Sequence, residues 1–395
     1  MKTEAFLILE DGTVFKGKHI GADKEVISEI VFNTSMAGYL EVLTDPSYAG
    51  QAVCMTYPLI GNYGVCLDDE ESRHPWPDAF IVRELSRTYS NFRADMSLGE
   101  YLEKHGIPGI EKIDTRALTK ILRDKGTMNG MITTNANYNL EEILPRLKAY
   151  SVGDVVTLTT CDKPYTLKGV SDLSENGALS GSASFNKADF EAGKREKKPA
   201  IVKALNGKGK KVALLDLGAK GNIGSSLQAR GCDVTIYPAH TKAEDILKDK
   251  PDGIMLSNGP GDPKTNTDII QEIKKLYDSE VPIFAICLGH QLMALATGAD
   301  TYKLKYGHRG GNHPVKDLKT GKVYISSQNH GYVVDTEKLS KDIAVEAFVN
   351  VNDGTNEGLA YTGKNIFTVQ FHPEACPGPQ DSSYLFDRFI EMMER

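Results

Sequence analysis

Residues 283–290 read IFAICLGH, and the character of the chain changes at Cys287. Four apolar residues precede the thiol. A glycine-containing turn follows it and leads directly into residues 291–296, QLMALA, a run typical of a helix. The order strand, sharp turn and helix exposes the side chain at the turn above the end of the strand, where the unpaired N–H groups of the helix favour a thiolate. The stretch therefore predicts a nucleophile, although a cysteine is more often buried at the end of a core strand.

The same strand pattern recurs upstream in residues 212–215, 234–237 and 253–256, with helical stretches between them. Short strands that are apolar almost throughout are typical of a parallel sheet covered on both faces. Functional side chains of such sheets gather at the carboxyl ends of the strands, where Cys287 lies. We therefore expect an α/β fold, with a mostly parallel C-terminal sheet flanked by helices.

The N-terminal half has a different pattern of residues. Residues 6–9 and 13–15 flank the Asp-Gly dipeptide at residues 11–12, which favours a tight hairpin turn. Further on, Asp114 can cap a helix that ends at Gly126. These features predict a separate, strand-rich mixed domain.

Residues 167–210 are rich in glycine, serine, lysine and glutamate and have little to bury. A chain of 395 residues is also too long for one ordinary core. We therefore expect an N-terminal domain over residues 1–166, a flexible connector over residues 167–210 and a C-terminal domain over residues 211–395.

Composition argues against several classes of function. The net charge of −7 leaves no excess of cations to neutralise phosphates, so nucleic acid is not an expected partner. The six cysteines are scattered without C-x-x-C spacing, so we expect no metal site and no disulfide scaffold, and the reducing cytoplasm is the expected compartment. The apolar stretch at the N-terminus is too short for a signal peptide, and no later stretch is expected to span a membrane.

Two further segments could complete a site around Cys287. Residues 256–263, LSNGPGDP, follow a strand and are either an ordinary tight loop or a source of backbone N–H groups for an oxyanion. His372 and Glu374 lie two residues apart near the end of another expected strand, so their side chains point to the same side. A carboxylate there can orient the imidazole while the imidazole exchanges protons with the thiol. Any one histidine is more often structural, but the three residues together could form a nucleophile, a base and an orienting group.

Nucleotide binding is not expected in this chain. Residues 218–224, GAKGNIG, follow a strand and open a helix, but their glycine spacing does not match G-x-G-x-x-G. The sequence also lacks the G-x-x-x-x-G-K-[ST] pattern of an ATP site.

Residues 257–263, 285–291 and 372–374 together resemble the class I glutamine amidotransferases in motif, order and spacing. That family usually has glycine where this chain has Ala285. The resemblance implies the fold of that class for the C-terminal domain and L-glutamine as the substrate.

Motifs in both halves narrow the resemblance to the family of carbamoyl-phosphate synthetase small subunits. The segments that carry it are residues 32–39 (FNTSMAGY), 43–48 (LTDPSY), 57–62 (YPLIGN), 113–116 (IDTR), 307–314 (GHRGGNHP) and 328–332 (QNHGY). Only the connector, which is longer than usual, falls outside it.

The resemblance implies a role for each site residue. Cys287 would attack the side-chain amide of glutamine and form a thioester, with His372 as the proton carrier and Glu374 as its orienting group. The backbone N–H groups of Gly259 and Leu288 would bind the oxyanion. The residues expected to contact glutamine are Ser47, Gly259, Gly261, Leu288, Gln291, Asn329, Gly331 and Tyr332.

The resemblance also implies a large synthetase subunit as partner, to which the N-terminal domain would dock. That subunit would bind ATP, bicarbonate and metal ions and receive the ammonia, so no cofactor is expected in this chain. The carbamoyl phosphate would serve arginine or pyrimidine synthesis, or both. The alternatives are another class I amidotransferase, such as one that feeds a GMP or anthranilate synthase, or a non-catalytic module with a relic cysteine.

Overall fold

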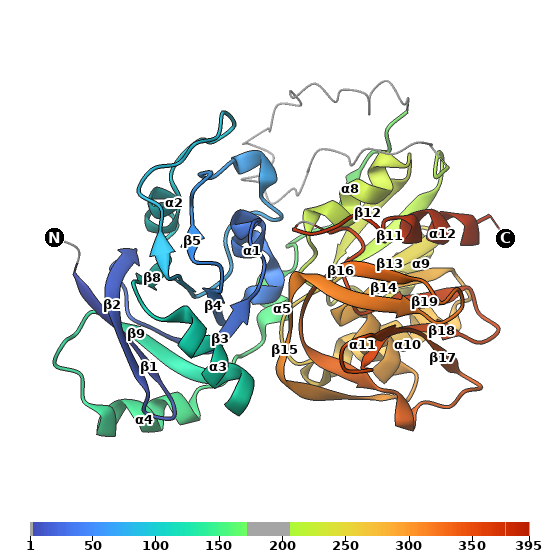
Figure 1. Cartoon of the computed structure of the whole chain (residues 1–395). Helices are drawn as coiled ribbons and strands as arrows, with labels where there is room; N and C mark the ends of the chain where they lie inside the picture. Colours follow the sequence, from blue (N-terminus) through green and yellow to red (C-terminus); the bar gives the residue numbers. More distant parts are fainter. Residues whose placement is uncertain (1–2, 172–205, 376, 395) are drawn as a thin grey trace. The chain divides into compact units, whose positions relative to one another are not determined.

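The computed structural model describes residues 3–171, 206–375 and 377–394 of the chain (Figure 1). It divides the chain into two compact units. Unit 1 comprises Met1–Glu70 and His74–Val155, and unit 2 comprises Glu71–Arg73 and Val156–Arg395. The boundary drawn from composition at residue 166 therefore falls within unit 2. Residues 172–205 of the expected connector lie outside the described part of the chain.

Unit 1 is built around a closed barrel with the strand order β1-β2-β8-β6-β4-β3-β9. The strand β1 pairs with β2 and β9 in antiparallel fashion, whereas β4 pairs in parallel with β3 and β6. The strand-rich mixed domain expected from the sequence is thus confirmed. The barrel strands are β1 (Glu4–Leu9), β2 (Val14–Gly21), β3 (Val26–Asn33), β4 (Gln51–Met55), β6 (Ala79–Ile81), β8 (Pro108–Glu111) and β9 (Met128–Thr133).

The other elements of unit 1 connect these strands. They are α1 (Tyr39–Thr44), η1 (Pro46–Tyr48), β5 (Leu59–Ile60), η2 (Leu67–Asp69), β7 (Glu84–Leu85), α2 (Leu98–Lys104), α3 (Thr115–Lys125) and α4 (Leu140–Ala149). The hairpin turn and the helix boundaries predicted from the sequence of this unit are confirmed. Gly12 adopts φ 86° in the β1–β2 turn. The Asp114 side chain caps α3 by accepting a hydrogen bond from the Ala117 N–H, and Gly126 (φ 105°) ends the helix.

Unit 2 contains a ten-stranded sheet in the order β10-β12-β11-β13-β14-β19-β18-β17-β15-β16. The neighbours from β12 to β19 run parallel, as the apolar runs predicted. These strands are β11 (Lys211–Asp216), β12 (Asp233–Pro238), β13 (Gly253–Leu256), β14 (Ile283–Ile286) and β19 (Ile366–Val369).

Antiparallel strands extend this core on both sides, so the sheet as a whole is mixed rather than mostly parallel. The long strands β15 and β16 mix polar and charged residues with apolar ones, even where they are buried, which is why they lack the continuous apolar pattern of the parallel core. The added strands are β10 (Tyr165–Leu167), β15 (Asp300–Asp317), β16 (Val323–Asp335), β17 (Ala344–Asn350) and β18 (Asn356–Tyr361).

Helices cover both faces of the parallel strands (Figure 1). Alternate residues of β14 point to opposite faces, as strand geometry requires. Ile283 and Ala285 pack in one core cluster with residues of α9, α10 and α11, and Phe284 and Ile286 pack in the other with residues of α8 and α12. The helices of unit 2 are α5 (Val155–Thr159), α8 (Gly221–Ala229), α9 (Ala243–Lys248), α10 (Thr267–Asp278), α11 (Leu288–Ala296) and α12 (Tyr384–Met392), with the short turns η3 (Pro263–Thr265) and η4 (Thr336–Lys338).

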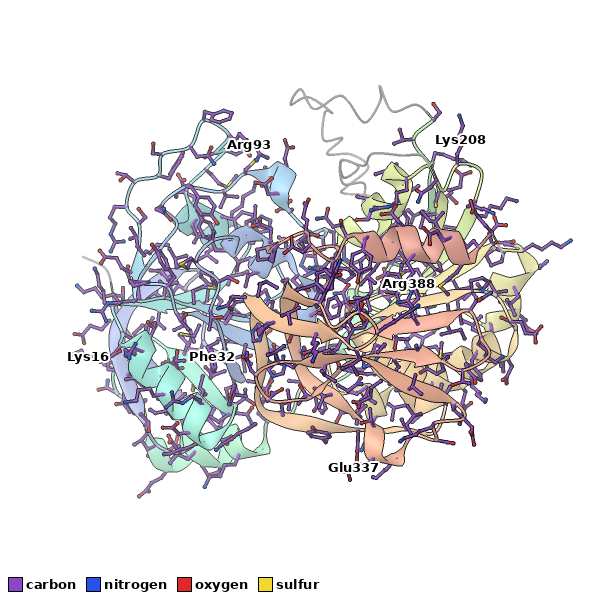
Figure 2. All side chains as sticks on the ribbon, turned by 45° about the vertical axis from the view of Figure 1, so that its right-hand side comes forward. Lys16, Phe32, Arg93, Lys208, Glu337 and Arg388 are labelled. Atoms are coloured by element: carbon purple, nitrogen blue, oxygen red, sulfur yellow. The ribbon has the colours of Figure 1, made fainter. Side chains whose placement is uncertain are left out.

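Aromatic rings fill the face of the sheet beneath α12. The rings of Phe284 and Phe367 stack with their centroids 4.4 Å apart. Arg388, labelled in Figure 2, extends from α12 and places its guanidinium 4.2 Å from the centroid of Phe367. Packing of this kind fixes the neighbouring strands β14 and β19, and the residues that follow their carboxyl ends form the site described below.

Candidate active site

Cys287 lies at a sharp turn between β14 and α11. Its backbone has φ 52° and ψ −105°, a conformation that costs a residue with a side chain about 1–3 kcal/mol. The turn is held by hydrogen bonds on both sides: the Cys287 N–H donates to the Val369 carbonyl at 2.8 Å, and the Gly289 N–H donates to the Ser257 carbonyl at 3.0 Å. A Cβ at Gly289 would lie 2.6 Å from the Leu256 carbonyl oxygen, so the turn requires glycine there. The expected order of strand, turn and helix is confirmed.

The side chain of Cys287 is not exposed, contrary to the sequence-based expectation. The residue is 2% exposed, and its Sγ lies 3.7 Å from the carbonyl oxygen of Asn329 on β16, to which the thiol donates. The antiparallel strand β16, which the apolar pattern did not indicate, supplies this cover. A strained backbone at a buried thiol with polar neighbours favours a functional cysteine over a simple core residue.

His372 and Glu374 follow β19 and meet as their spacing predicted. The Nδ1 of His372 lies 2.6 Å from Oε1 of Glu374, and both residues are buried. The backbone of His372 is fixed separately, because its N–H donates to the Ser327 carbonyl at 2.9 Å. The carboxylate therefore sets both the orientation and the tautomer of the imidazole, and it leaves Nε2 as the nitrogen available for chemistry.

The charges of this pair stabilise each other. Burial lowers the pKa of His372, but the charge of Glu374 and the neighbouring Cys287 thiol raise it by more, so the net shift is upward. Burial raises the pKa of Glu374, but Lys220 and His372 together lower it well below its usual range. The carboxylate therefore favours a proton on the imidazole. The contribution of Cys287 to the pKa of His372 indicates that the thiol lies beside the ring, whose Nε2 has no hydrogen-bond partner within the described part of the chain.

Lys220 is a site residue that the sequence analysis missed. Its Nζ lies 2.9 Å from Oε1 of Glu374, and it donates to the Ala375 carbonyl at 2.6 Å. Its backbone N–H donates to Oδ1 of Asn258 at 2.9 Å, which ties the residue to the loop after β13. Lys220 belongs to the segment considered for phosphate binding. Its position after the carboxyl end of β11 was the available signal, since the other site residues follow strand ends in the same way.

Gly259 and Leu288 are the two residues expected to bind an oxyanion. A Cβ at Gly259 would lie 2.1 Å from the Leu217 carbonyl oxygen and 2.8 Å from Cδ2 of Leu288, so this loop packs tightly against the cysteine turn. The N–H of Leu288 is the first of α11 and has no acceptor within the helix. Among residues 3–171, 206–375 and 377–394, the structure gives neither N–H a hydrogen-bond acceptor.

In unit 2, a hydrogen bond joins Gln291 to β16, the strand that carries three more of the residues expected to contact glutamine. The Nε2 of Gln291 donates to the Tyr332 carbonyl at 2.8 Å and to Oε1 of Gln370 at 3.0 Å. Tyr332, Gly331 and Asn329 belong to β16, the strand whose Asn329 carbonyl meets the Cys287 thiol.

The other two expected contacts come from a loop and from the other unit. Gly261 adopts φ 90° in the loop after β13, a conformation suited to glycine. Ser47 lies in unit 1, in the short helix η1, where its N–H donates to Oδ1 of Asp45 at 2.9 Å. Its contact with glutamine stays a prediction.

Two other structural features bear on function. His308, His330 and Glu357 form a group whose donor atoms could hold a metal ion, on strands outside the cysteine turn. In the part of the chain that the structure describes, no helix combines the length and the apolar character needed to cross a membrane.

Comparison with known proteins gives matches to both halves of the chain. The family described as "Carbamoyl-phosphate synthase small chain, CPSase domain" matches residues 7–132. The family described as "Glutamine amidotransferase class-I" matches residues 213–392.

Relatives named carbamoyl phosphate synthase small chain align over almost the whole chain. The relative from Clostridium perfringens is 47% identical over 388 residues, which cover 98% of this chain and 99% of the relative. The relative from Fusobacterium nucleatum is also 47% identical, with 98% of each chain covered. The relative from Akkermansia muciniphila is 46% identical, with 98% of this chain and 97% of the relative covered.

Proposed function

The chain belongs to the family of carbamoyl-phosphate synthase small chains, and from that premise we propose that Cys287, His372 and Glu374 carry out its glutaminase reaction. As the glutamine-hydrolysing subunit, the chain converts glutamine into glutamate and ammonia. The observation that carries the assignment of residues is the contact of 2.6 Å between His372 and Glu374, with the Cys287 thiol beside the imidazole.

The first half of the reaction forms a thioester. The Sγ of Cys287 gives its proton to His372 as it attacks the side-chain carbonyl carbon of glutamine. The carbonyl oxygen becomes an oxyanion, which the N–H groups of Gly259 and Leu288 bind. One such donor typically contributes about a hundredfold to a thousandfold to the rate. His372 then gives its proton to the departing nitrogen, and ammonia leaves as the C–N bond breaks.

The second half hydrolyses the thioester. His372, now neutral, accepts a proton from water as the water oxygen attacks the thioester carbon. The proton returns to the sulfur as the C–S bond breaks, and glutamate is released. Throughout the cycle Glu374 holds the imidazole with Nε2 toward the sulfur, and Lys220 balances the buried charge of Glu374.

The proposed contacts with glutamine follow the motifs of the family. We assign the contacts with the amino and carboxylate groups of glutamine to Gln291 and Ser47, and those that complete the pocket to Gly261, Asn329, Gly331 and Tyr332. The hydrogen bonds that Gln291 makes with Tyr332 and Gln370 support this assignment, because they pre-organise that side of the pocket.

The family membership implies a large subunit as the partner of this chain. We place the ATP, bicarbonate and metal ions of the synthetase reaction on that subunit, so catalysis by this chain requires no cofactor. The barrel unit is the proposed docking surface. The complex works in the cytoplasm, apart from membranes and nucleic acid. Failure of isolated residues 1–155 to co-purify with the large subunit, when the full chain does so, would count against the docking surface.

One assay separates the possible functions. Glutamate release and carbamoyl phosphate formation are measured with glutamine or ammonia as the nitrogen source, with the large subunit present, for the wild-type chain and Cys287→Ser. We expect the variant to lose glutamine-dependent synthesis while ammonia-dependent synthesis continues. Glutamate release without carbamoyl phosphate would indicate another class I amidotransferase, and no glutamate release by the wild type would indicate a relic site.

A further inference from the structure

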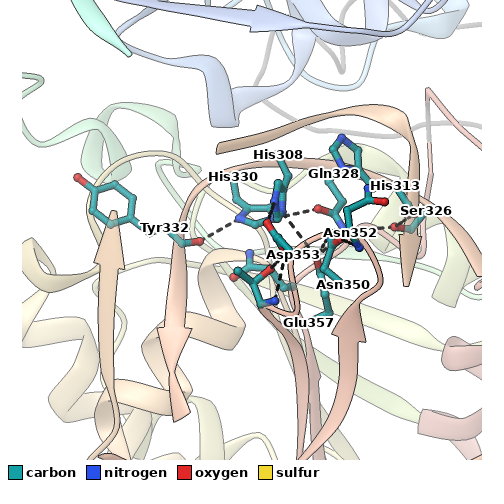
Figure 3. Close-up of polar contacts among 12 residues, drawn as sticks. His308, His313, Ser326, Gln328, His330, Tyr332, Asn350, Asn352, Asp353 and Glu357 are labelled. Atoms are coloured by element: carbon teal, nitrogen blue, oxygen red, sulfur yellow. Dashed lines mark hydrogen bonds and ion pairs between the residues drawn. The ribbon is translucent and has the colours of Figure 1, made fainter. Parts of the chain in front are cut away.

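A second buried cluster of ionisable side chains lies outside the cysteine site (Figure 3). His308 on β15 and His330 on β16 are direct partners across the antiparallel ladder, and Glu357 on β18 lies beneath them. All three are buried: His308 is 7% exposed, His330 is 5% exposed and Glu357 is fully covered. One donor atom from each lies within 4.8 Å of the others.

Two atoms of this cluster lack the partners that buried polar atoms normally have. Nδ1 of His308 and Oε2 of Glu357 are buried, and within the described part of the chain neither makes a hydrogen bond. The gap between Nδ1 of His308 and Oε1 of Glu357 is 3.7 Å, too long for a hydrogen bond. An unpaired buried polar atom typically costs about 1–3 kcal/mol, so this arrangement calls for a further group.

The remaining ring nitrogens are held as metal-bound histidines usually are. Nε2 of His308 lies 2.8 Å from the Asp353 carboxylate, and Nδ1 of His330 lies 2.9 Å from the Tyr332 carbonyl oxygen. A histidine that donates its second N–H to a carboxylate or a carbonyl presents the lone pair of the other nitrogen to a cation. The carboxylate is likewise supported, because Oε1 of Glu357 accepts from Gln328 and Asn350, both at 2.8 Å.

The side chain of Gln328 places two hydrogen-bond acceptors against each other, and a bound cation would remove this mismatch. Donation from Nδ1 of a neutral His330 ring to the Tyr332 carbonyl leaves Nε2 as an acceptor. That acceptor faces another one, Oε1 of Gln328, at 3.1 Å, while the amide nitrogen of Gln328 donates to Glu357. Rotating the amide by half a turn only moves the conflict to Glu357, where two oxygens would then meet. No placement of hydrogens on this neutral ring satisfies every partner.

We propose that Nδ1 of His308, Nε2 of His330 and the Glu357 carboxylate bind a divalent transition-metal ion of the zinc type. Two imidazoles and one carboxylate are a common ligand set for zinc, at about 2.0–2.2 Å from each atom. Atoms bound to one ion at those distances lie about 3–4 Å apart. Nδ1 of His308 and Oε1 of Glu357 meet this spacing at 3.7 Å, and donor atoms of the three residues lie within 4.8 Å of one another. Cysteine spacing, the basis for expecting no metal, carries no information about this set.

A proton on His308 is the competing occupant. Burial lowers the pKa of His308, but the carboxylates of Asp353 and Glu357 raise it to about 9. A proton on Nδ1 of His308 would still lie too far from Glu357 for a hydrogen bond, because the two atoms are 3.7 Å apart. It would also leave Nε2 of His330 facing an acceptor. A metal ion satisfies both histidines and the carboxylate together.

The ion would stabilise the strand that carries the proposed glutamine contacts. His330 stands between Asn329 and Gly331 on β16, and the Tyr332 carbonyl that orients its ring also accepts from Gln291. This role is structural and rests on the proposed function only for its link to glutamine. Metal binding itself can be measured without any assay of activity.

Metal content and ligand type can be tested on the full-length chain. A Cys287→Ser background removes the thiol that would compete for zinc. The chain is stripped with a chelator, dialysed against Zn²⁺, Co²⁺ or Mg²⁺, and analysed by elemental analysis and, for Co²⁺, by visible absorption. We expect one equivalent of zinc or cobalt, no retained magnesium, and a cobalt spectrum without thiolate charge-transfer bands. A folded chain that retains no zinc, or a cobalt spectrum of thiolate type, would overturn the proposal.

Three variants locate the ion. His308→Gln and Glu357→Gln should lose stoichiometric zinc, and Asp353→Asn, which removes only a supporting contact, should weaken zinc affinity by about 10–100-fold. His313→Gln is the matched control, because the ring of His313 lies 5.3 Å from that of His308 but is not a proposed ligand. Circular dichroism of each metal-free variant checks its fold. Unchanged zinc binding by folded Glu357→Gln or Asp353→Asn would place the ion elsewhere and refute the assignment.

Discussion

Lys220 and Glu374 form an ion pair inside unit 2, with Nζ 2.9 Å from Oε1 and side-chain exposures of only 2% and 0%. The pair joins the segment after β11 to the segment after β19. Glu374 in turn contacts His372 at 2.6 Å, so three charged groups form one buried chain. The charge of Lys220 lowers the pKa of both Glu374 and His372, which makes this lysine part of the electrostatic balance of the site.

Replacing Lys220 with methionine should destabilise unit 2 strongly. The change keeps the side chain long and unbranched but removes the charge that faces the buried carboxylate of Glu374, and breaking a buried pair in this way typically costs about 3–5 kcal/mol. Thermal unfolding of the full chain measures the loss. The matched control is Lys168→Met, because Lys168 pairs with Asp233 at 2.8 Å on the surface, where such pairs contribute about 0–1 kcal/mol. Equal effects of the two substitutions would contradict a structural role for the buried pair.

The strained turn at Cys287 predicts an unusual order of stability. With φ 52°, glycine suits this position better than alanine, so Cys287→Gly should unfold at a higher temperature than Cys287→Ala, by about 1 kcal/mol in free energy. Both variants should lack glutaminase activity. At Cys54, a buried cysteine in the strand β4, the order should reverse, because glycine weakens a strand. The same order at both positions would argue that the turn is not strained.

The His372–Glu374 pair predicts a defined dependence of stability on pH. The pKa of Glu374 falls to about 2, so its contribution is complete above the unfolded-state value of about 4.3 and is lost as the pH falls. Net attraction raises the pKa of His372 to about 10, so its contribution is complete below about 6.5 and is lost as the pH rises. The stability difference between wild type and Glu374→Gln should therefore be largest between pH of about 4.5 and 6.5.

Unfolding by denaturant at several pH values measures this difference. It should shrink below about pH 4.3, where Glu374 becomes protonated in the unfolded state, and again above about pH 6.5, where His372 loses its proton in the unfolded state. The control is Glu337→Gln, since Glu337 is an exposed glutamate, labelled in Figure 2, and its removal should leave the profile flat. A difference between wild type and Glu374→Gln that grows on acidification would show that the carboxylate is not held ionised.

Local sequence patterns anticipated the parts of the site that depend on neighbours in the chain. The turn at Cys287 and the contact of His372 with Glu374 are set by strand ends and by a spacing of two residues, so both could be read directly. The Lys220 contact could not, because it joins segments that only the fold brings together. The burial of Cys287 was also missed, because it depends on the antiparallel strand β16, whose mixed pattern hid its place in the sheet.

The loop at Gly259 offers a test of the oxyanion site that leaves every reacting side chain in place. In Gly259→Ala, the new Cβ would lie 2.1 Å from the Leu217 carbonyl oxygen and 2.8 Å from Cδ2 of Leu288, so the loop must move away from the cysteine turn. A displaced N–H no longer stabilises the oxyanion, and kcat should fall by about a hundredfold to a thousandfold. Gly153→Ala is the control, because a Cβ there meets nothing within 4 Å. Steady-state glutaminase rates with the large subunit present, together with thermal unfolding, distinguish a local effect from loss of fold. A folded Gly259→Ala chain with an unchanged kcat would mean that the N–H of Gly259 does not bind the oxyanion, and the donors would then have to be sought elsewhere along the cysteine turn.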